Sequence, residues 1–186
     1  MKIIKNAFNQ MLFKKIVDEI SDSSFPWHYS SSAYKIERND LFNYSFSHTL
    51  YCDKEIKSRT YPLAYAAFND FMLRNDESLN EILRIRTGLI GVTSTPYIHE
   101  PHVDFSFEHK TALIYLNESD GPTTFYNEIY NPESNVDPRD YCKKHTVDVK
   151  IDPEPNKIII FNGLKYHTSC TPTIVPRRLV MNFNYI

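Results

Sequence analysis

From residue 83 onward, apolar side chains recur at every second position, and this period limits what the chain can fold into. Short runs rich in β-branched and aromatic residues are separated by Asn, Asp, Pro and Gly. The runs are Leu83–Thr93, His102–Phe105, Thr111–Leu116, Thr123–Tyr130, Thr146–Ile151, Lys157–Asn162, Tyr166–Ser169 and Arg178–Ile186. Such a series predicts a closed or sandwiched antiparallel sheet.

Two earlier segments have helical spacing instead. Gln10–Ile20 and Tyr61–Asn75 each place apolar residues on one face of a helix. Both helices are expected to cover a sheet. Helices followed by an unbroken series of strands predict a mainly β, α+β fold, with the N-terminal helices packed outside a double-stranded β-helix, the cupin-like jelly roll.

The chain has 186 residues, which fits one domain. We expect a helical support region over residues 1–82 and a jelly-roll core over residues 83–186. The longest irregular connection, Asn131–Lys144, is expected to be a surface loop near the mouth of the barrel that decides specificity.

Composition excludes several classes of protein. The 21 basic and 23 acidic side chains are intermixed, so no concentrated positive face is available for a nucleic-acid backbone. Only four glycines argue against a phosphate-loop enzyme, and no apolar stretch approaches the roughly 20 residues that span a membrane. The first fifteen residues mix Lys and Asn into their apolar positions, unlike a secretory signal, so we expect a cytoplasmic protein. Cys52, Cys142 and Cys170 lack metal-binding spacing and are expected to be free thiols.

Three residues form a candidate metal site. His102 and Asp104 are two positions apart, so on a strand they would share one face, and His167 follows a later strand. Two histidines and one carboxylate leave open positions on a metal ion, as in non-haem Fe(II) oxygenases. The alternative is that each histidine is an ordinary hydrogen-bonded surface or core residue, because a His-x-Asp pair often arises by chance.

A longer series of motifs surrounds these residues. In order, they are His102-Val103-Asp104, Thr111 to Asn117, Asp120-Gly121 with Thr123, Ile158 to Gly163 before His167, and Arg178 with Asn182-Phe183. This series resembles the 2-oxoglutarate and Fe(II)-dependent oxygenases, and within them the small prolyl-4-hydroxylase-like members, including compact bacteriophage-type enzymes. The resemblance extends from Leu83 to the end of the chain.

The resemblance implies roles for individual residues. His102, Asp104 and His167 would ligate Fe(II), and the hydroxyl group of Tyr115 would donate to the far carboxylate of 2-oxoglutarate. An arginine near the C-terminus would pair with the same carboxylate, and two neighbouring arginines are candidates.

Strand alternation separates Arg177 from Arg178. Arg177 would share a face with apolar residues, and that face can pack under the helices. Arg178 would share the mixed face with Val180 and Asn182, and the family's Arg-x-x-x-Asn-Phe pattern falls on it. We therefore choose Arg178 and keep Arg177 as the alternative.

The resemblance also implies a reaction. Fe(II), 2-oxoglutarate and dioxygen, with ascorbate in support, would couple oxidative decarboxylation of 2-oxoglutarate to succinate with hydroxylation of a substrate C–H bond. Asp104 favours hydroxylation or demethylation over halogenation, because halide-transferring relatives replace this carboxylate. The expected substrate is a peptide, a protein or a small molecule, rather than nucleic acid. Two other classes stay open, namely a metal-dependent hydrolase and a non-catalytic jelly-roll protein of a binding or phage structural kind.

The remaining candidates are weaker. His99 immediately precedes the motif, and both Tyr97 and Arg86 are candidates to line a pocket, although we expect Arg86 to be the outward half of an alternating strand. The other histidines are expected to lie at the surface. They are His28, His48, His109 and His145.

Overall fold

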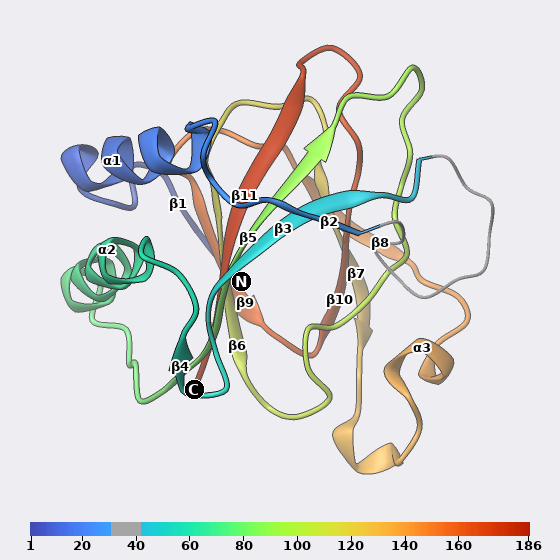
Figure 1. Cartoon of the computed structure of the whole chain (residues 1–186). Coiled ribbons are helices and arrows are strands. Elements are labelled where there is room, and N and C mark those ends of the chain that lie inside the picture. The colour runs from blue at the N-terminus through green and yellow to red at the C-terminus, as the bar shows by residue number, and fades with distance from the viewer. Residues whose placement is uncertain (31–41) are drawn as a thin grey trace.

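Two antiparallel sheets face each other, and two helices cover the outer face of the larger one (Figure 1). The computed structural model describes residues 1–30 and 42–186. The larger sheet has the order β1-β9-β6-β11-β5-β3-β2, with β4 beside β3, and the smaller sheet has the order β10-β7-β8. The chain is therefore mainly β with flanking helices, and its sheets form a jelly roll rather than a closed barrel.

The element bounds are as follows. The larger sheet contains β1 (Lys2–Ile4), β2 (His28–Ser30), β3 (Ser45–Cys52), β4 (Glu55–Ile56), β5 (Ile82–Gly91), β6 (Lys110–Tyr115), β9 (Ile158–Asn162) and β11 (Arg177–Tyr185). The smaller sheet contains β7 (Thr123–Ile129), β8 (Val147–Ile151) and β10 (Lys165–Ser169). The helical elements are α1 (Gln10–Ser21), α2 (Tyr61–Arg74), the 3-10 turn η1 (Pro132–Ser134) and the short α3 (Pro138–Tyr141).

Both predicted helices and seven of the eight predicted runs are confirmed, with ends shifted by one or two residues. The run His102–Phe105 is wrong, because it belongs to a loop in which His102 makes an isolated bridge to His167. Pro101 immediately precedes this bridge and has no N–H to extend a ladder.

The segment before residue 83 is more than helical support. It supplies β1 to β4, and β3 pairs along its length with β5 in the larger sheet. The expectation missed β3 because its apolar residues Phe46 and Leu50 are diluted by Ser, His and Thr, although the residues still alternate.

The helices pack on the larger sheet through one apolar core. Phe68 of α2 stacks on Phe183 of β11, with ring centroids 4.2 Å apart. Leu179 and Met181 belong to the same core and share the face of Phe183. This packing commits one face of β11 to the helices, so its other face lies between the two sheets.

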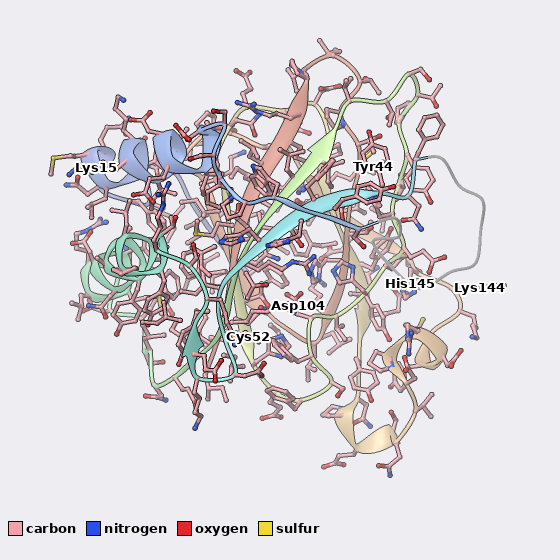
Figure 2. The ribbon with its side chains drawn as sticks, viewed as in Figure 1. Lys15, Tyr44, Cys52, Asp104, Lys144 and His145 are labelled. Carbon is pink, nitrogen blue, oxygen red and sulfur yellow. The ribbon has the colours of Figure 1, made fainter. Side chains whose placement is uncertain are left out.

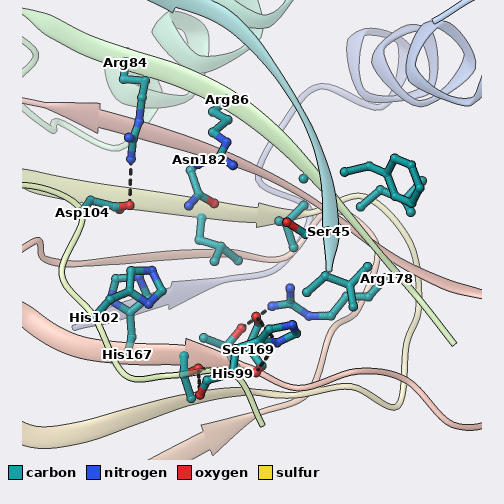
Figure 3. Close-up of a pocket in the computed structure, with 18 residues that line it drawn as sticks. Ser45, Arg84, Arg86, His99, His102, Asp104, His167, Ser169, Arg178 and Asn182 are labelled. Atoms are coloured by element: carbon teal, nitrogen blue, oxygen red, sulfur yellow. Dashed lines mark hydrogen bonds and ion pairs between the residues drawn. The ribbon is translucent and has the colours of Figure 1, made fainter. Parts of the chain in front are cut away.

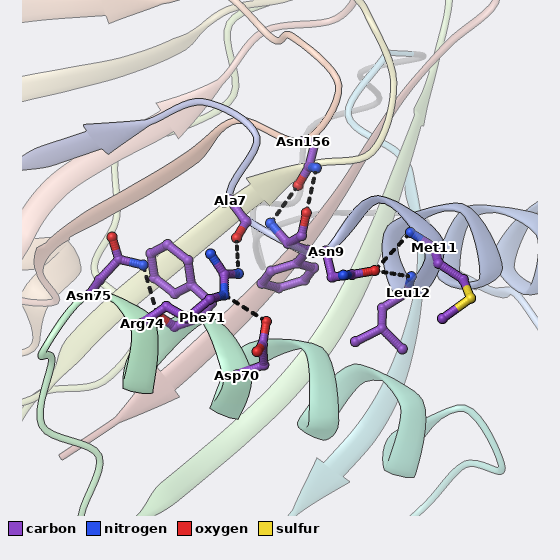
Figure 4. A network of polar contacts seen from close by, with 10 residues as sticks. Ala7, Asn9, Met11, Leu12, Asp70, Phe71, Arg74, Asn75 and Asn156 are labelled. Atoms are coloured by element: carbon purple, nitrogen blue, oxygen red, sulfur yellow. Dashed lines mark hydrogen bonds and ion pairs between the residues drawn. The ribbon is translucent and has the colours of Figure 1, made fainter.

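A polar clamp holds the segment between β1 and α1 against the rest of the fold (Figure 4). The buried Asn156 side chain accepts a hydrogen bond from the Phe8 N–H at 2.8 Å and donates to the Phe8 carbonyl at 2.9 Å. Arg74 of α2 donates to the Ala7 carbonyl at 2.7 Å. These bonds satisfy backbone groups that burial would otherwise leave without partners.

The connection Asn131–Lys144 contains η1 and α3, and most of its residues are exposed. It lies at the lower right in Figure 1. Among the described residues, no helix is long and apolar enough to span a membrane. All three cysteines are free.

Candidate functional site

A cavity of about 130 Å³ opens between the two sheets (Figure 3). The described residues that line it are Ser45, Phe46, Arg84, Arg86, Gly88, Leu89, Ile90, His99, His102, Asp104, Leu113, Thr123, His167, Thr168, Ser169, Arg178, Val180 and Asn182. Asp104 is the one carboxylate in this set. In Figure 2 it lies in the interior, whereas Lys15 and Lys144 lie at the periphery. The cavity therefore joins the predicted metal site to the predicted arginine.

The structure brings His102, Asp104 and His167 together. Each residue offers one ligand atom, and these three atoms all lie within 4.8 Å of one another. His167 belongs to β10, and His102 lies opposite it, where each backbone N–H donates to the other's carbonyl at 3.0 Å. This reciprocal pair fixes the separation of the two imidazoles, whose centroids are 4.5 Å apart.

Both histidines are prepared to act as metal ligands. Their Nδ1 atoms lie 3.3 Å from the Glu100 carbonyl and 3.1 Å from the Lys165 carbonyl, respectively. A carbonyl can only accept, so Nδ1 carries the proton and Nε2 carries the lone pair. Burial, together with His167, lowers the pKa of His102 to about 3, and burial also lowers the pKa of His167. Both imidazoles are thus neutral at physiological pH, as metal ligation requires.

Three side chains hold the Asp104 carboxylate. Arg84 donates to Oδ1 at 2.8 Å, while Asn184 and Thr111 donate to Oδ2 at 2.8 and 3.3 Å. Arg84 and Thr111 lie opposite Asn184 on the two strands that flank β11. Burial opposes ionisation of Asp104, but Arg84 and the two histidines outweigh it and hold its pKa well below the usual range. Sequence reasoning missed this set, because the three residues meet only through strand register.

The sequence-predicted arginine lines the same cavity. Arg178 is 2% exposed, and it donates from Nε to the Gly121 carbonyl at 2.9 Å and from Nη2 to the Thr123 hydroxyl at 2.7 Å. Arg177 is exposed instead. The predicted alternation along β11 is therefore confirmed.

An asparagine orients this end of β11. The Asn117 side chain donates to the Arg177 carbonyl at 2.8 Å and accepts from the Leu179 N–H at 2.7 Å. The two bonds bracket Arg178 and turn its side chain toward the cavity. This is a structural reason for an asparagine directly after the apolar run that ends at Leu116.

The Asp120-Gly121 pair fixes the loop before β11. Asp120 accepts hydrogen bonds from the backbone N–H groups of Thr173, Ile174 and Val175 at 2.8 to 3.2 Å. Burial opposes ionisation, but these bonds hold the pKa of Asp120 at about 2. A Cβ on Gly121 would lie 2.4 Å from the Cys170 carbonyl oxygen, so this close approach requires glycine.

Tyr115 lies behind the cavity wall. Its ring is fully buried, and its hydroxyl donates to Thr123 Oγ1 at 2.6 Å and to the Ile151 carbonyl at 3.2 Å. The hydroxyl group that lines the cavity at this point is that of Thr123. The predicted contact between Tyr115 and a dicarboxylate stays a prediction, and the structure adds Thr123 to the candidates.

Two weaker candidates also line the cavity. His99 is 2% exposed, and its Nδ1 lies 3.2 Å from the Ser169 hydroxyl. Arg86 faces the cavity, so the expectation that it points outward is wrong. Tyr97 contacts His99 edge to face with centroids 5.2 Å apart.

Loss of the hydrogen bond from Arg84 to Asp104 is expected to weaken metal binding strongly. We expect Arg84→Gln to weaken Mn(II) or Co(II) binding about ten- to a hundredfold, because the carboxylate loses its orienting partner. Calorimetry measures the affinity, and the spectrum of bound Co(II) reports the altered ligand field. Arg139→Gln is a matched control, because Arg139 pairs with Asp137 on the exposed α3. Equal affinities in the two variants would refute this role.

Comparisons with known proteins support the fold. No family model matches the sequence, and no curated protein matches it. Two prolyl hydroxylase structures match with a TM-score of 0.64. One, from Trichoplax adhaerens in complex with a hypoxia inducible factor peptide fragment, is 14% identical, with 100% of this chain and 82% of that chain covered. The other, a prolyl-4-hydroxylase from Pseudomonas putida, is 12% identical, with 99% and 91% covered.

A third structure is the epimerase SnoN in complex with Fe3+, alpha ketoglutarate and nogalamycin RO. It is 12% identical, has a TM-score of 0.68, and is matched over 99% of this chain and 77% of that chain. This chain has the fold of the 2-oxoglutarate and Fe(II)-dependent oxygenases.

Proposed function

We propose that this chain is an Fe(II)- and 2-oxoglutarate-dependent dioxygenase, and more narrowly a hydroxylase of the prolyl-4-hydroxylase type. One observation carries the proposal. The same cavity holds a two-histidine, one-carboxylate set and a buried arginine. This donor set fits Fe(II), since two neutral imidazoles and one carboxylate bind it and leave positions open.

Different residues would bind the metal, orient its carboxylate ligand and exclude water. His102, Asp104 and His167 would hold the metal, and Arg84 keeps Asp104 ionised and oriented. Bound Fe(II) with 2-oxoglutarate supplies the chemistry that couples decarboxylation to succinate with hydroxylation of a substrate C–H bond. Phe125 and Phe161 pack on the His167 imidazole at 6.0 and 4.9 Å between centroids, which excludes water from that side.

Arg178 would bind the far carboxylate of 2-oxoglutarate. Its guanidinium is buried and already fixed by Gly121 and Thr123, so little side-chain freedom is lost when a carboxylate binds. Thr123 would offer its hydroxyl to the same carboxylate. We place Tyr115 behind it, where its hydroxyl bonds to Thr123 and its ring lies 5.6 Å from the Arg178 guanidinium.

For the substrate we propose a peptide or protein first and a small molecule second. The Trichoplax structure holds a peptide and the SnoN structure holds nogalamycin RO, so the shared fold accepts both. Among the described residues, those of Asn131–Lys144 do not line the cavity. Any influence of this connection on specificity would therefore be exerted outside the cavity wall.

The reaction itself gives a direct test. With Fe(II), ascorbate and dioxygen but no added substrate, the protein should convert 2-oxoglutarate to succinate slowly, because the metal ligands and the arginine are present in one cavity. Anaerobic addition of 2-oxoglutarate to the Fe(II) protein should produce a visible metal-to-ligand charge-transfer band. Asp104→Gly should lose succinate formation, and it should not gain chloride transfer.

Two other classes predict different results. A metal-dependent hydrolase would bind the metal but show no charge-transfer band with 2-oxoglutarate, since it needs no dicarboxylate site. A non-catalytic jelly-roll protein would show no succinate under any condition. A complete absence of succinate from protein that holds Fe(II) and 2-oxoglutarate would favour this last class over our proposal.

A further inference from the structure

Two adjoining cavities lie outside the site described above, where the chain enters α2. One, of about 340 Å³, is lined by Ser24, Phe25, Pro26, His48, Lys57, Ser58, Arg59 and Thr60. The other, of about 330 Å³, is lined by His28, Ser47, His48, Thr49 and Lys57. His48 and Lys57 belong to both. Figure 1 shows the chain passing from β4 into α2 beside β3, which carries His48.

Two buried polar groups in these walls have no hydrogen bond of ordinary geometry among the described residues. Thr60 is 1% exposed, and its hydroxyl makes no hydrogen bond. His48 is 6% exposed, and neither of its ring nitrogens makes a hydrogen bond of ordinary geometry, although the Pro26 carbonyl interacts with the ring. The expectation that His48 lies at the surface is therefore wrong. Such groups are costly to bury, so they point to something that satisfies them in the cavity.

The Thr60 hydroxyl does not make the hydrogen bond that an N-cap side chain usually makes. Thr60 is the N-cap of the 14-residue helix α2, yet its side chain makes no capping bond. Instead, the Ser58 hydroxyl accepts the Thr60 N–H at 3.3 Å. The buried hydroxyl of Thr60 thus has no partner among the described residues and lies at a helix N-terminus, where the positive end of the helix dipole favours an anion.

Among the described residues, the fully charged side chains that line the cavities are positive. Lys57 and Arg59 line the larger cavity, and no carboxylate lines either cavity among the described residues. Three carboxylates lie nearby. Glu55 pairs with Lys57, Asp53 also helps to raise the pKa of Lys57, and Asp22 is close enough to Arg59 for the guanidinium to help lower its pKa. Both pairs lie at the exposed rim, so they are weak competitors for a ligand with two negative charges.

His48 contributes a neutral aromatic ring to the cavity wall. Its ring packs edge to face on Phe25 at 4.8 Å between centroids and stacks on His28 at 5.7 Å. Burial and His28 lower the pKa of His48 by more than the hydrogen bond to the Pro26 carbonyl raises it, so the imidazole is neutral. Aromatic rings therefore form the floor of the cavity.

We propose that these cavities form a binding site for a phosphate-type dianion, held by Lys57, Arg59 and the Thr60 hydroxyl, with His48 in the wall. The phosphate oxygens accept hydrogen bonds from these donors and lie at the N-terminus of α2. Phe25 and Pro26 form an apolar wall against which an organic group attached to the phosphate would pack. This site is independent of the proposed oxygenase function.

The test uses the full-length, isotope-labelled protein without added metal or 2-oxoglutarate, titrated with inorganic phosphate and with phenyl phosphate. Saturable shifts of the Ser58, Arg59 and Thr60 amide signals are expected in nuclear magnetic resonance spectra. Lys57→Ala and Thr60→Val should each weaken binding about five- to tenfold or more, because each removes a donor to a charged acceptor. Tighter binding of phenyl phosphate would assign an organic phosphate as the ligand, and equal binding would assign inorganic phosphate.

Control variants separate binding from folding. Thr60→Ser keeps the hydroxyl and should bind within about twofold of the original protein. Lys14→Ala removes an exposed lysine that is likewise paired with a carboxylate, Asp18, and should leave binding unchanged. Thr60→Val removes a buried hydroxyl without a partner, so its thermal stability should be equal or higher. Unsaturable shifts, the same shifts with chloride at equal ionic strength, or unchanged binding by Thr60→Val would overturn the site and leave water as its occupant.

Discussion

Replacing His167 with alanine is expected to lower Fe(II) affinity by more than about a hundredfold and to abolish succinate formation. His167 supplies one of three ligand atoms that lie within 4.8 Å of one another, and the described residues offer no fourth His, Cys, Asp or Glu to this group. The fold should persist, because His167 pairs with His102 through backbone atoms that alanine retains. Anaerobic calorimetry and succinate assays give the two readouts.

The volume lost at His167 needs its own control. The imidazole packs between Phe125 and Phe161, so His167→Gln fills more of the space than alanine and should be closer to the original stability. His145→Ala is the matched control for a histidine outside the cavity, and it should keep full affinity. Undiminished Fe(II) affinity and turnover in His167→Ala, with circular dichroism showing a native fold, would eliminate the proposed metal site.

Arg178→Ala is expected to raise the apparent 2-oxoglutarate constant by about one and a half to three and a half decades. This range corresponds to about 2–5 kcal/mol for the loss of one partner of a buried, charge-assisted pair. The same change to exposed Arg177 should have little effect, since its side chain lies on the other face of β11. The measurement is the dependence of succinate formation, and of the charge-transfer band, on 2-oxoglutarate concentration.

The arginine pair also distinguishes a binding role from a structural one. Arg178 bonds to Gly121 and Thr123, so its loss can loosen the loop that leads into β7. Arg178→Lys restores a positive charge without the planar fork, and it should recover part of the 2-oxoglutarate affinity. If Arg177→Ala alone weakened 2-oxoglutarate binding, the assignment of the pocket face of β11 would be wrong.

Local sequence pattern is sufficient where one face of an element is uniformly apolar. On β11, Leu179, Met181 and Phe183 pack against the helices, and their alternation in the sequence is enough to predict that Arg178 and Arg177 lie on opposite faces. The two long helices are predictable for the same reason. When one face of a helix or strand is buried, its apolar residues recur at a regular spacing, and this spacing can be read from a single sequence.

The sequence pattern does not predict contacts that depend on strand register, or strands whose residues are of mixed polarity. Arg84, Asn184 and Thr111 meet at Asp104 because they are neighbours across three strands, and register is set by the whole sheet. The strand β3 escapes prediction because polar residues occupy half of its positions. Residue type alone assigns His48 to the surface, whereas packing against Phe25 buries it.

The three candidate ligands are anchored to different sheets. The two imidazoles belong to the smaller sheet and its bridge, whereas the Asp104 carboxylate is bound by side chains from three strands of the larger sheet. An ion bound by all three would cross-link the two sheets, and sliding of one sheet over the other would break its coordination. Mechanical stiffness of the sandwich and metal content should therefore rise together, and hydrogen exchange along β10 and β11 should slow on loading.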